Sequence, residues 1–331
     1  MPVTIKDIAR AAGVSHTTVS RALKDHPRIS AGTKERIQRL AREMGYTPSA
    51  VAQSLLSQRT QTIGLVITTI ADPYVVRVVE GVESVAQSAG YSVFLSISHN
   101  NPDQEMAVVE TFRRRRVDAI IVTSSRVGNL YSSQLDKIQV PIVLINNQVE
   151  GEYLYSVAVD DVQGARLAVE HLLSLGHRRI GYVGVTDRPK SNRRRLAGYQ
   201  AALERAGLAE NPALALSPAA EGDIKRGEAA LEPSLAAGVS AVFCYNDVIA
   251  IGLLTAAYKR GVAIPQDLSV IGFDDIEMAY YTTPPLTTIY QPRLRMGQQA
   301  MSMALDLLHG QKVQDQVLQG ELVVRGSTAS P

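Results

Sequence analysis

Near the start of the chain, four polar side chains recur at a spacing suited to binding a partner: His16, Thr17, Ser20 and Arg21. On a helix these four lie on one face, which carries an imidazole, two hydroxyls and a guanidinium but no carboxylate. An arginine can bind the O6 and N7 atoms of guanine together, and hydroxyls can bind phosphate oxygens. Any one of these residues alone would more often be only solvent-exposed. Their combination predicts a helix that reads DNA bases.

A second polar set follows the ends of short apolar runs later in the chain. Ligands of open α/β sheets bind beyond the carboxyl ends of the strands, so side chains at these ends are candidate ligand contacts. The set mixes carboxylates, amides and an arginine, which suits a ligand dense in hydroxyls. For Asp247 and Asp275, capping of a helix is an equally good interpretation. The set consists of Thr68, Thr69, Asp72, Tyr74, Asn146, Asn147, Arg193, Asn246, Asp247, Asp274 and Asp275.

Other chemistries have no support in the sequence. There is no Gly-x4-Gly-Lys-Ser/Thr phosphate loop, no His-Glu-x2-His zinc motif and no Gly-x-Ser-x-Gly nucleophile motif. A single cysteine, Cys244, excludes an internal disulfide framework and a multi-cysteine metal site. We expect no cofactor and no metal, and we interpret His171 and His177 as structural. The run Arg113–Arg116 is interpreted as a solvated helix end, with a nucleic-acid site as the alternative.

Three short helices are predicted to position the first set. Thr4-Ile5-Lys6-Asp7 fits a capping box that begins the first helix, and Gly13 supplies the left-handed residue that ends it. Ser15 caps the second helix, which carries the donor-rich face. Three helices with a tight glycine turn between the first two make a helix-turn-helix bundle. The apolar positions of the third helix recur at helical spacing and are Ile37, Leu40, Ala41 and Met44.

Charge separates this head from the rest of the chain. Residues 1–60 hold ten lysines and arginines against four acids, a net charge of +6. Subtraction from the totals of 34 and 32 leaves 24 against 28 for residues 61–331, a net charge of −4. A basic head on a mildly acidic body is typical of a polyanion-binding module attached to another domain. A solvated basic surface would give the same count.

Beyond Arg59, short apolar runs alternate with amphipathic segments. The amphipathic segments include residues 77–89, 165–175 and 298–308. This alternation predicts parallel sheets with helices on both faces, and two series of apolar runs predict two similar lobes. The predicted strands cover residues 63–67, 92–97, 119–122 and 142–145 in the first series and 180–183, 241–243 and 268–271 in the second.

Several stretches of the head form one long signature. They are TIKDIA at residues 4–9, AGVS at 12–15, TVSRAL at 18–23 and GYTPSAVAQSL at 45–55. This signature resembles that of the LacI/GalR family of bacterial transcription regulators. The resemblance implies a helix-turn-helix head followed by a hinge helix, which is too short to be stable alone and should order when paired with its twin on DNA.

The resemblance also implies roles for individual head residues. His16 and Thr17 match the pair that discriminates between operator sequences, and Arg21 matches a further base reader. Ala52 and Leu55 match hinge residues that enter the minor groove, where an apolar wedge unstacks a base step and kinks the duplex. A helix contact with Val51 is the alternative for Leu55. The full set implied to contact DNA is Thr4, Ser15, His16, Thr17, Thr18, Ser20, Arg21, Ser49, Ala52, Leu55 and Leu56.

The body carries further matching stretches, GHRRI at residues 176–180, NDVIAIG at 246–252 and PLTTI at 285–289. They resemble the effector domain of the same family, which is similar to periplasmic sugar-binding proteins. One departure concerns Glu221-Gly222-Asp223, which stands where the family often has a stacking aromatic before the helix expected near Lys225. The residues implied to bind the effector are Thr69, Tyr74, Asn146, Asp160, Arg193, Asn246, Asp274 and Gln291.

The predicted fold is an all-α helix-turn-helix domain with a hinge helix, followed by an α/β core. The core is expected to hold two doubly wound parallel-sheet lobes like those of type I periplasmic binding proteins. The expected boundaries are 1–47 for the DNA-binding domain, 48–60 for the hinge and 61–331 for the core. Within the core we expect an N-lobe of about 61–161 and 292–324 and a C-lobe of about 162–291.

We expect a repressor whose affinity for near-palindromic double-stranded DNA is set by a small polar effector, a carbohydrate, bound between the lobes. A purine or nucleoside effector, a solute-binding receptor and an enzyme that uses Asp274 and Asp275 are the alternatives. No apolar run reaches the roughly 18 residues of a membrane helix, and Met1–Arg10 has no signal-peptide core, so we expect a cytoplasmic protein. No leucine heptads follow Val324, so we expect a homodimer.

Overall fold

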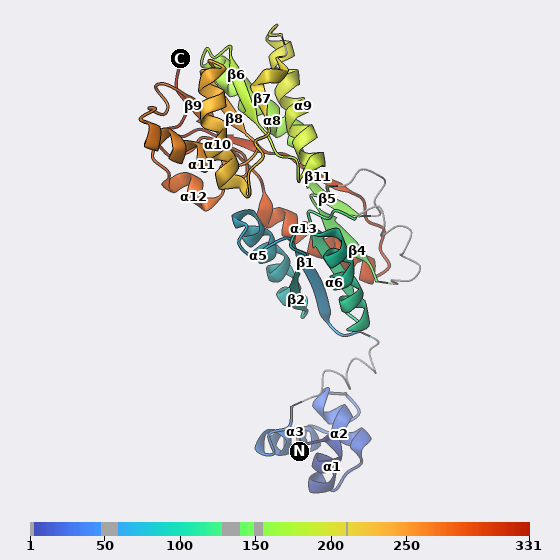
Figure 1. Ribbon diagram of the computed structural model, residues 1–331. Helices are drawn as coiled ribbons and strands as arrows, with labels where there is room; N and C mark the ends of the chain where they lie inside the picture. The colour runs from blue at the N-terminus through green and yellow to red at the C-terminus, as the bar shows by residue number, and fades with distance from the viewer. Residues whose placement is uncertain (1–2, 48–58, 128–139, 149–154, 210) are drawn as a thin grey trace. The chain divides into compact units, whose positions relative to one another are not determined.

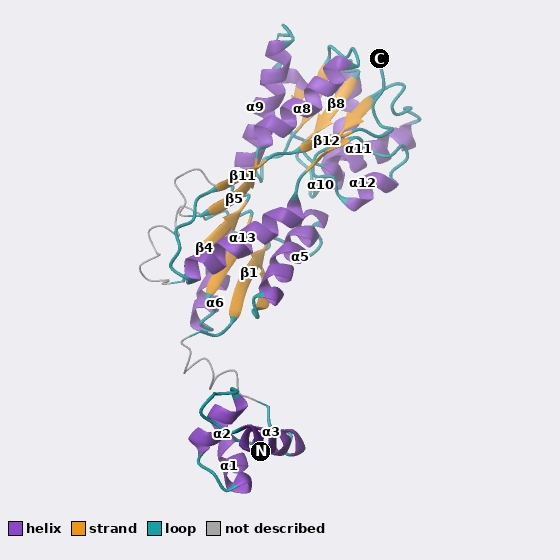
Figure 2. Ribbon diagram, turned by 180° about the vertical axis from the view of Figure 1, so that it is seen from behind, coloured by secondary structure: helices purple, strands orange, loops and turns teal. Residues whose placement is uncertain are grey.

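The computed structural model describes residues 3–47, 59–127, 140–148, 155–209 and 211–331. The chain divides into two compact units, residues 1–60 and 61–331. The first unit holds three described helices, α1 (Ile5–Ala12), α2 (His16–Leu23) and α3 (Ala31–Glu43) (Figure 1). The second unit is an α/β structure with two lobes (Figures 1 and 2).

Local signals in the sequence fix the helices of the first unit. The Asp7 carboxylate accepts hydrogen bonds from the Thr4 amide at 3.0 Å and the Thr4 hydroxyl at 2.7 Å, which confirms the predicted capping box. Gly13 ends α1 in the left-handed region with a φ of 63°. Ile8, Val19 and Ile37, one from each helix, are fully buried against one another and form the centre of a small apolar core.

The N-lobe of the second unit contains a six-stranded parallel sheet. Its strand order is β11-β5-β4-β3-β1-β2. Helices α5 (Pro73–Ser88) and α13 (Arg293–Leu308) pack on one face, and α6 (Pro102–Arg114) packs on the other. The strands are β1 (Thr62–Ile67), β2 (Ser92–Ile97), β3 (Ala119–Thr123), β4 (Ile142–Ile145), β5 (Ser156–Val159) and β11 (Gln316–Leu318).

The C-lobe contains a four-stranded parallel sheet in the order β7-β6-β8-β9. Helices α8 (Asp161–Ser174) and α9 (Pro189–Arg205) cover one face, and α10 (Asp223–Ala236) and α11 (Asp247–Arg260) cover the other. The remaining elements are β6 (Ile180–Val183), η1 (Pro212–Leu214), β7 (Ala215–Leu216), β8 (Ala241–Cys244), β9 (Ser269–Ile271) and α12 (Glu277–Tyr281).

The chain crosses between the lobes three times, after β5, after β10 (Thr288–Tyr290) and after β11. The third crossing corrects the predicted N-lobe segment 292–324, because β12 (Glu321–Val323) pairs antiparallel with β10 rather than joining the N-lobe sheet. Leu322 packs against the C-lobe core, and Ser327 donates its hydroxyl to the Val270 carbonyl at 2.6 Å. The last residues therefore belong to the C-lobe.

The predicted fold class is confirmed: a helical head precedes a core of two parallel-sheet lobes with helices on both faces. Among the described residues, no helix is both long enough and apolar enough to cross a membrane.

Candidate functional site

Two adjoining cavities in the second unit lie at the carboxyl ends of strands from both sheets. The outer cavity has a volume of about 480 Å³, and the inner one about 40 Å³. They share Asp72, Ser124 and Arg188 as lining residues. This is the position at which open α/β sheets bind ligands, because the loops that follow parallel strands meet there.

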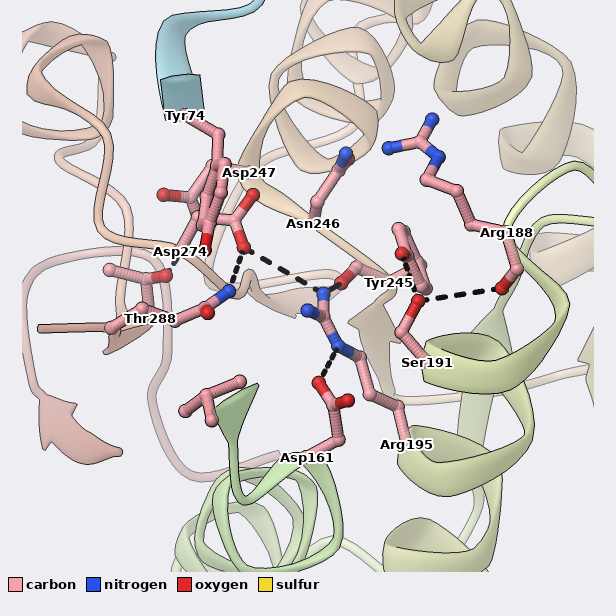
Figure 3. A network of polar contacts seen from close by, with 12 residues as sticks. Tyr74, Asp161, Arg188, Ser191, Arg195, Tyr245, Asn246, Asp247, Asp274 and Thr288 are labelled. Atoms are coloured by element: carbon pink, nitrogen blue, oxygen red, sulfur yellow. Dashed lines mark hydrogen bonds and ion pairs between the residues drawn. The ribbon is translucent and has the colours of Figure 1, made fainter. Parts of the chain in front are cut away.

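Arg195, on α9, holds together the polar network of the inner cavity (Figure 3). Its Nε donates to Asp161 Oδ1 at 2.9 Å, and its Nη1 donates to the Tyr245 carbonyl and lies 3.7 Å from Asp274 Oδ1. Its guanidinium carbon lies 4.3 Å from the centroid of the Tyr245 ring and 3.7 Å from that of Phe273. Because these partners fix the orientation of the planar guanidinium group, its N–H groups that have no partner among the described residues point in a defined direction.

Asp274, just after β9, faces Arg195 across the inner cavity (Figure 3). Its backbone has a φ of 117°, a conformation that residues other than glycine rarely adopt. Its Oδ1 accepts a hydrogen bond from Gln291 Nε2 at 2.6 Å. Burial raises the pKa of Asp274 to about 7, although Arg195 and Arg293 oppose the shift. The side chain can therefore bind a ligand either as a carboxylate or as a carboxylic acid near neutral pH.

The N-lobe contributes Asn146 and Tyr74 to the same cavity. Asn146 follows β4 with a φ of 47°, and its Nδ2 donates to the Tyr74 hydroxyl at 2.7 Å. Its Oδ1 accepts from the Val159 amide at 3.2 Å, which fixes the orientation of the side-chain amide. Burial raises the pKa of Tyr74 above its ordinary value, so this phenol stays neutral and remains a donor.

A hydrogen-bonded chain crosses from one lobe to the other at the inner cavity. Gln148, just after β4 in the N-lobe, accepts at Oε1 from the Ser191 hydroxyl at 3.0 Å. Ser191 lies on α9 in the C-lobe, and its hydroxyl is 2.7 Å from the Tyr245 hydroxyl (Figure 3). The interlobe contact closes this end of the cleft.

Charged side chains from the C-lobe form one wall of the outer cavity. Arg188 Nη2 contacts both Asp223 carboxylate oxygens, at 2.6 and 2.7 Å, and Arg226 Nη1 contacts Asp223 Oδ1 at 2.8 Å. Asn246 Nδ2 donates to Asp223 Oδ2 at 2.6 Å. Burial alone would raise the pKa of Asp223, but the Arg188 ion pair and these hydrogen bonds hold it below its ordinary value. Asp223 is therefore ionised and positions both arginines.

Formal charges around the inner cavity balance, because Asp72 and Asp274 face Arg188 and Arg195. Gln291 Oε1 is buried and accepts no hydrogen bond from the described residues, although Gln291 lines this cavity. An unpaired buried acceptor costs about 1–3 kcal/mol, which a ligand hydroxyl donating to it would recover. The arrangement is therefore suited to a neutral ligand with hydroxyl groups.

The first unit presents its own polar face on α2. His16, Thr17 and Arg21 are exposed, whereas Ser20 is half-buried. Ser15 caps the helix by accepting from the Thr18 amide at 3.1 Å. Arg21 has no ion pair with any of the described residues, so its guanidinium is available to a partner.

Comparison with known proteins identifies the family. Residues 4–49 match the bacterial regulatory proteins of the lacI family, and residues 169–328 match a periplasmic binding protein-like domain. The HTH-type transcriptional repressor CytR of Escherichia coli (strain K12) is 34% identical over 331 residues, which cover 98% of this chain and 96% of CytR. The chain belongs to the LacI family.

Solved structures of similar proteins agree with this assignment. This LacI-family chain matches the Lac repressor dimer bound to operator and the anti-inducer ONPF with a TM-score of 0.89 and 29% identity, over 99% of this chain and 100% of that one. The transcriptional regulator CelR in complex with cellobiose matches with a TM-score of 0.74 and 27% identity, over 98% and 99%. The predicted family and function are confirmed: the chain is a DNA-binding transcriptional regulator, and these relatives are regulators rather than enzymes.

The structure of this LacI-family core brings together six of the eight residues predicted to bind the effector. Thr69 lines the outer cavity, and the inner cavity is lined by Tyr74, Asn146, Asn246, Asp274 and Gln291. Their contacts with an effector remain predictions. Asp247, for which capping was the alternative, is fully buried and accepts from the Ile276 amide at 2.8 Å and from the Thr288 hydroxyl, so it holds the loop that carries Asp274.

Two of the predicted residues lie elsewhere. Arg193 is exposed on α9 and lines neither cavity, and the arginine in the cleft is Arg195. The reason is helical phase, since two residues turn a helix by about 200°. Asp160 caps α8 by accepting from the Gln163 amide at 3.1 Å and also lines neither cavity.

Sequence reasoning missed several residues that line the cavities, namely Ser124, Gln148, Asp187, Arg188, Ser191, Arg195, Asp223, Arg226 and Tyr245. Helical spacing could have found Arg195, because Ser191, Arg195, Gly198 and Tyr199 are all buried on one face of α9. Helix α10 begins at Asp223 rather than near Lys225. The hinge residues Ser49, Ala52, Leu55 and Leu56 lie outside the described residues.

Proposed function

We propose that this regulator is a homodimeric repressor that binds a near-palindromic operator through α2. The support is the exposed donor-rich face of α2. We assign His16, Thr17 and Arg21 to base edges and Ser15, Thr18 and Ser20 to phosphates. Thr4 at the start of α1 and the hinge residues Ser49, Ala52, Leu55 and Leu56 complete the proposed DNA contacts. A dimer with two-fold symmetry presents this face twice, and this requires an operator of two related half-sites. Because the operator lies on the bacterial chromosome, the protein acts in the cytoplasm.

The effector that we propose is a neutral carbohydrate bound in the cleft between the lobes. The single observation that carries this proposal is the buried Gln291 Oε1, which accepts no hydrogen bond from the described residues and belongs to a cavity lined by donors and acceptors. Arg195 and Asn146 donate to the effector, and Asp274 accepts from its hydroxyls. The similar regulator CelR was solved as a complex with cellobiose, which supports a carbohydrate as the class of effector.

The environment of the two tyrosines favours a carbohydrate over a purine or nucleoside. The Tyr245 ring lies 5.1 Å from the Arg188 guanidinium and 4.3 Å from that of Arg195. The Tyr74 ring lies 6.0 Å from the Arg293 guanidinium. Because each ring already contacts a guanidinium group, the face that the guanidinium covers is not available for stacking on a base, whereas hydrogen bonding to hydroxyls does not need that face.

Two apolar surfaces support the proposed homodimer. Strand β2 is the last strand of the N-lobe sheet, and its Phe94 and Leu95 are 47% and 40% exposed. On α12 of the C-lobe, Tyr280 and Tyr281 are 63% and 71% exposed. Exposed apolar residues on an edge strand are a liability unless another surface covers them. A second copy of the chain is the occupant that we propose.

A thermal-shift screen of sugars, polyols, sugar phosphates, nucleosides and purines tests the effector class. A true ligand at 100 times its dissociation constant should add about 2.7 kcal/mol to the free energy of unfolding. We expect this stabilisation from a neutral sugar or polyol. Stabilisation by nucleosides or purines alone would contradict the proposal and favour the alternative effector class.

A further inference from the structure

The run Arg113–Arg116 lies at the end of the N-lobe where the core begins. Helix α6 ends at Arg114 beside the start of β1, as Figures 1 and 2 show. Two hydrogen bonds join the two segments: the Asp118 carboxylate accepts from the Gln61 amide at 2.9 Å, and the Asp118 amide donates to the Thr62 carbonyl at 2.8 Å. The arginine run is therefore held next to the point where the polypeptide enters the core from the hinge.

This edge of the core carries a surplus of positive charge. All four arginines are exposed, with 76% of the Arg114 side chain accessible. Residues 110–118 contain four arginines and two acids, Glu110 and Asp118, a formal surplus of +2. Glu110 engages Arg113 at 2.6 Å and Arg114 at 2.9 Å, and the Asp118 carboxylate binds the Gln61 amide. A solvated helix end explains the exposure of the run but assigns no role to the surplus charge.

The chain that connects the DNA-binding unit to the core brings duplex DNA, a polyanion, to this edge. Residues 48–58 separate the described part of the DNA-binding unit from the core, and eleven extended residues span at most roughly 40 Å. DNA bound by α2 is therefore held by a unit that these eleven residues tether to the edge of the core carrying the arginine run. Duplex DNA carries one negative charge per roughly 1.7 Å of its axis, so no other polyanion is delivered to this surface at a comparable local concentration.

We propose that Arg113–Arg116 is a second, sequence-independent DNA contact, in which the core binds backbone phosphates of the duplex held by the head. This proposal rests on the DNA binding described above and extends it from the head to the core. Arg114 and Arg115 are the principal ligands, because Glu110 holds Arg113 more tightly than Arg114. At 0.1 M salt electrostatic attraction decays over about 10 Å, so a measurable contribution means that phosphates come close to these side chains.

The salt dependence of DNA binding tests the proposal. The full-length chain is titrated against a fluorescein-labelled duplex that the wild-type protein has selected from a random library, at 50–250 mM KCl. The variant Arg114→Gln/Arg115→Gln is compared with the control Arg205→Gln/Arg260→Gln, which removes two charges from the C-lobe whose side chains are 68% and 66% exposed. A third variant, Arg114→Lys/Arg115→Lys, retains the charge.

Each lost phosphate contact should reduce the slope of log K against log salt by about 0.9. We expect the glutamine variant to lower the slope by about 1–4 in the dimer, to weaken binding equally for selected and unrelated duplexes, and to leave the sequence preference unchanged. The lysine variant and the C-lobe control should keep the wild-type slope. A change in this slope below about 0.5, or an equal change in the C-lobe control, would overturn the proposal. Such a result is also expected if the run binds an acidic protein instead of DNA. Failure of the wild-type chain to select any duplex would instead contradict the function proposed for the head.

Discussion

Arg195 reaches three residues of the polar network at once, namely Asp161, Asp274 and Tyr245 (Figure 3). We expect Arg195→Lys to weaken effector binding at least 10-fold, since lysine keeps the charge but loses the planar fork that bonds several partners together. The measurement is calorimetric titration with the ligand found in the thermal-shift screen. Arg193→Lys, two residues away and exposed, is the matched control and should bind as the wild type does. Weaker effector binding by Arg193→Lys, together with unchanged binding by Arg195→Lys, would show that Arg193 is the arginine that binds the effector.

Asp274 makes the stability of the effector-free protein depend on pH. Burial raises its pKa from 3.8 to about 7, so the folded protein binds a proton that the unfolded chain releases. This contribution to stability is fully present below about pH 4 and is lost as pH rises through 7. Between pH 5 and pH 8, the wild type should lose about 2 kcal/mol more unfolding free energy than Asp274→Asn. Urea denaturation at both pH values measures this difference, and parallel curves for the two proteins would show that Asp274 stays ionised.

The difference between Arg193 and Arg195 shows where sequence reasoning about the site reached its limit. The strand ends located Tyr74, Asn146, Asn246 and Asp274, because the loops that follow parallel strands meet at the cleft. A position on a helix needs the correct phase as well. The arginines at positions 193–195 offered three candidates, and only their relation to buried Ser191 and Tyr199 separates them.

Helix α2 is the element on which sequence-specific DNA binding depends. Arg21→Ala should cost about 1–3 kcal/mol for each lost bidentate contact and relax specificity at one symmetric pair of operator positions. Arg39→Ala removes a 66% exposed arginine from α3 and should leave the sequence preference unchanged. The measurement is the affinity for a set of single-base operator variants. Equal weakening on every sequence would make Arg21 a phosphate contact instead.

Strand β2 is the element that we expect to join two copies of the chain. Leu95→Asp should give a monomer at micromolar concentration, because it places a charge on the apolar edge of the N-lobe sheet. Val317→Asp is the matched control, since β11 forms the opposite edge of the same sheet and Val317 is 56% exposed. Light scattering distinguishes the two states. A dimeric Leu95→Asp variant together with a monomeric Val317→Asp variant would move the interface to the other edge.

Strands could be predicted from the sequence where a segment is largely apolar. The expected strands at residues 92–97, 142–145 and 180–183 have the bounds of β2, β4 and β6. Strands β5, β7, β10 and β11 escaped prediction because each is short, and neither β7 nor β11 has a buried residue. Strand β12 is equally short, and it forms only by pairing with β10 across 30 residues of sequence, which no local pattern specifies. This is why the third crossing between the lobes was missed.

Considering the molecule as a whole, the cleft can control DNA binding because the residues that line it come from both lobes. Asn146 and Gln148 belong to the N-lobe, whereas Ser191 and Arg195 lie on α9 in the C-lobe. A ligand bound among them favours one arrangement of the lobes over others, and three chain crossings join these lobes. A ligand shifts an equilibrium between two states only if it binds them with different affinities. Effector and operator must therefore alter each other's affinity by the same factor.

Allosteric control of DNA binding is decided by the operator affinity of the wild-type protein without effector and with saturating effector, measured by fluorescence anisotropy at fixed salt. We expect the effector to change the operator dissociation constant by about 5- to 150-fold, the usual range for coupled sites. Saturating operator should change the effector dissociation constant by the same factor. An operator affinity that stays the same across the full range of effector concentrations would contradict allosteric control.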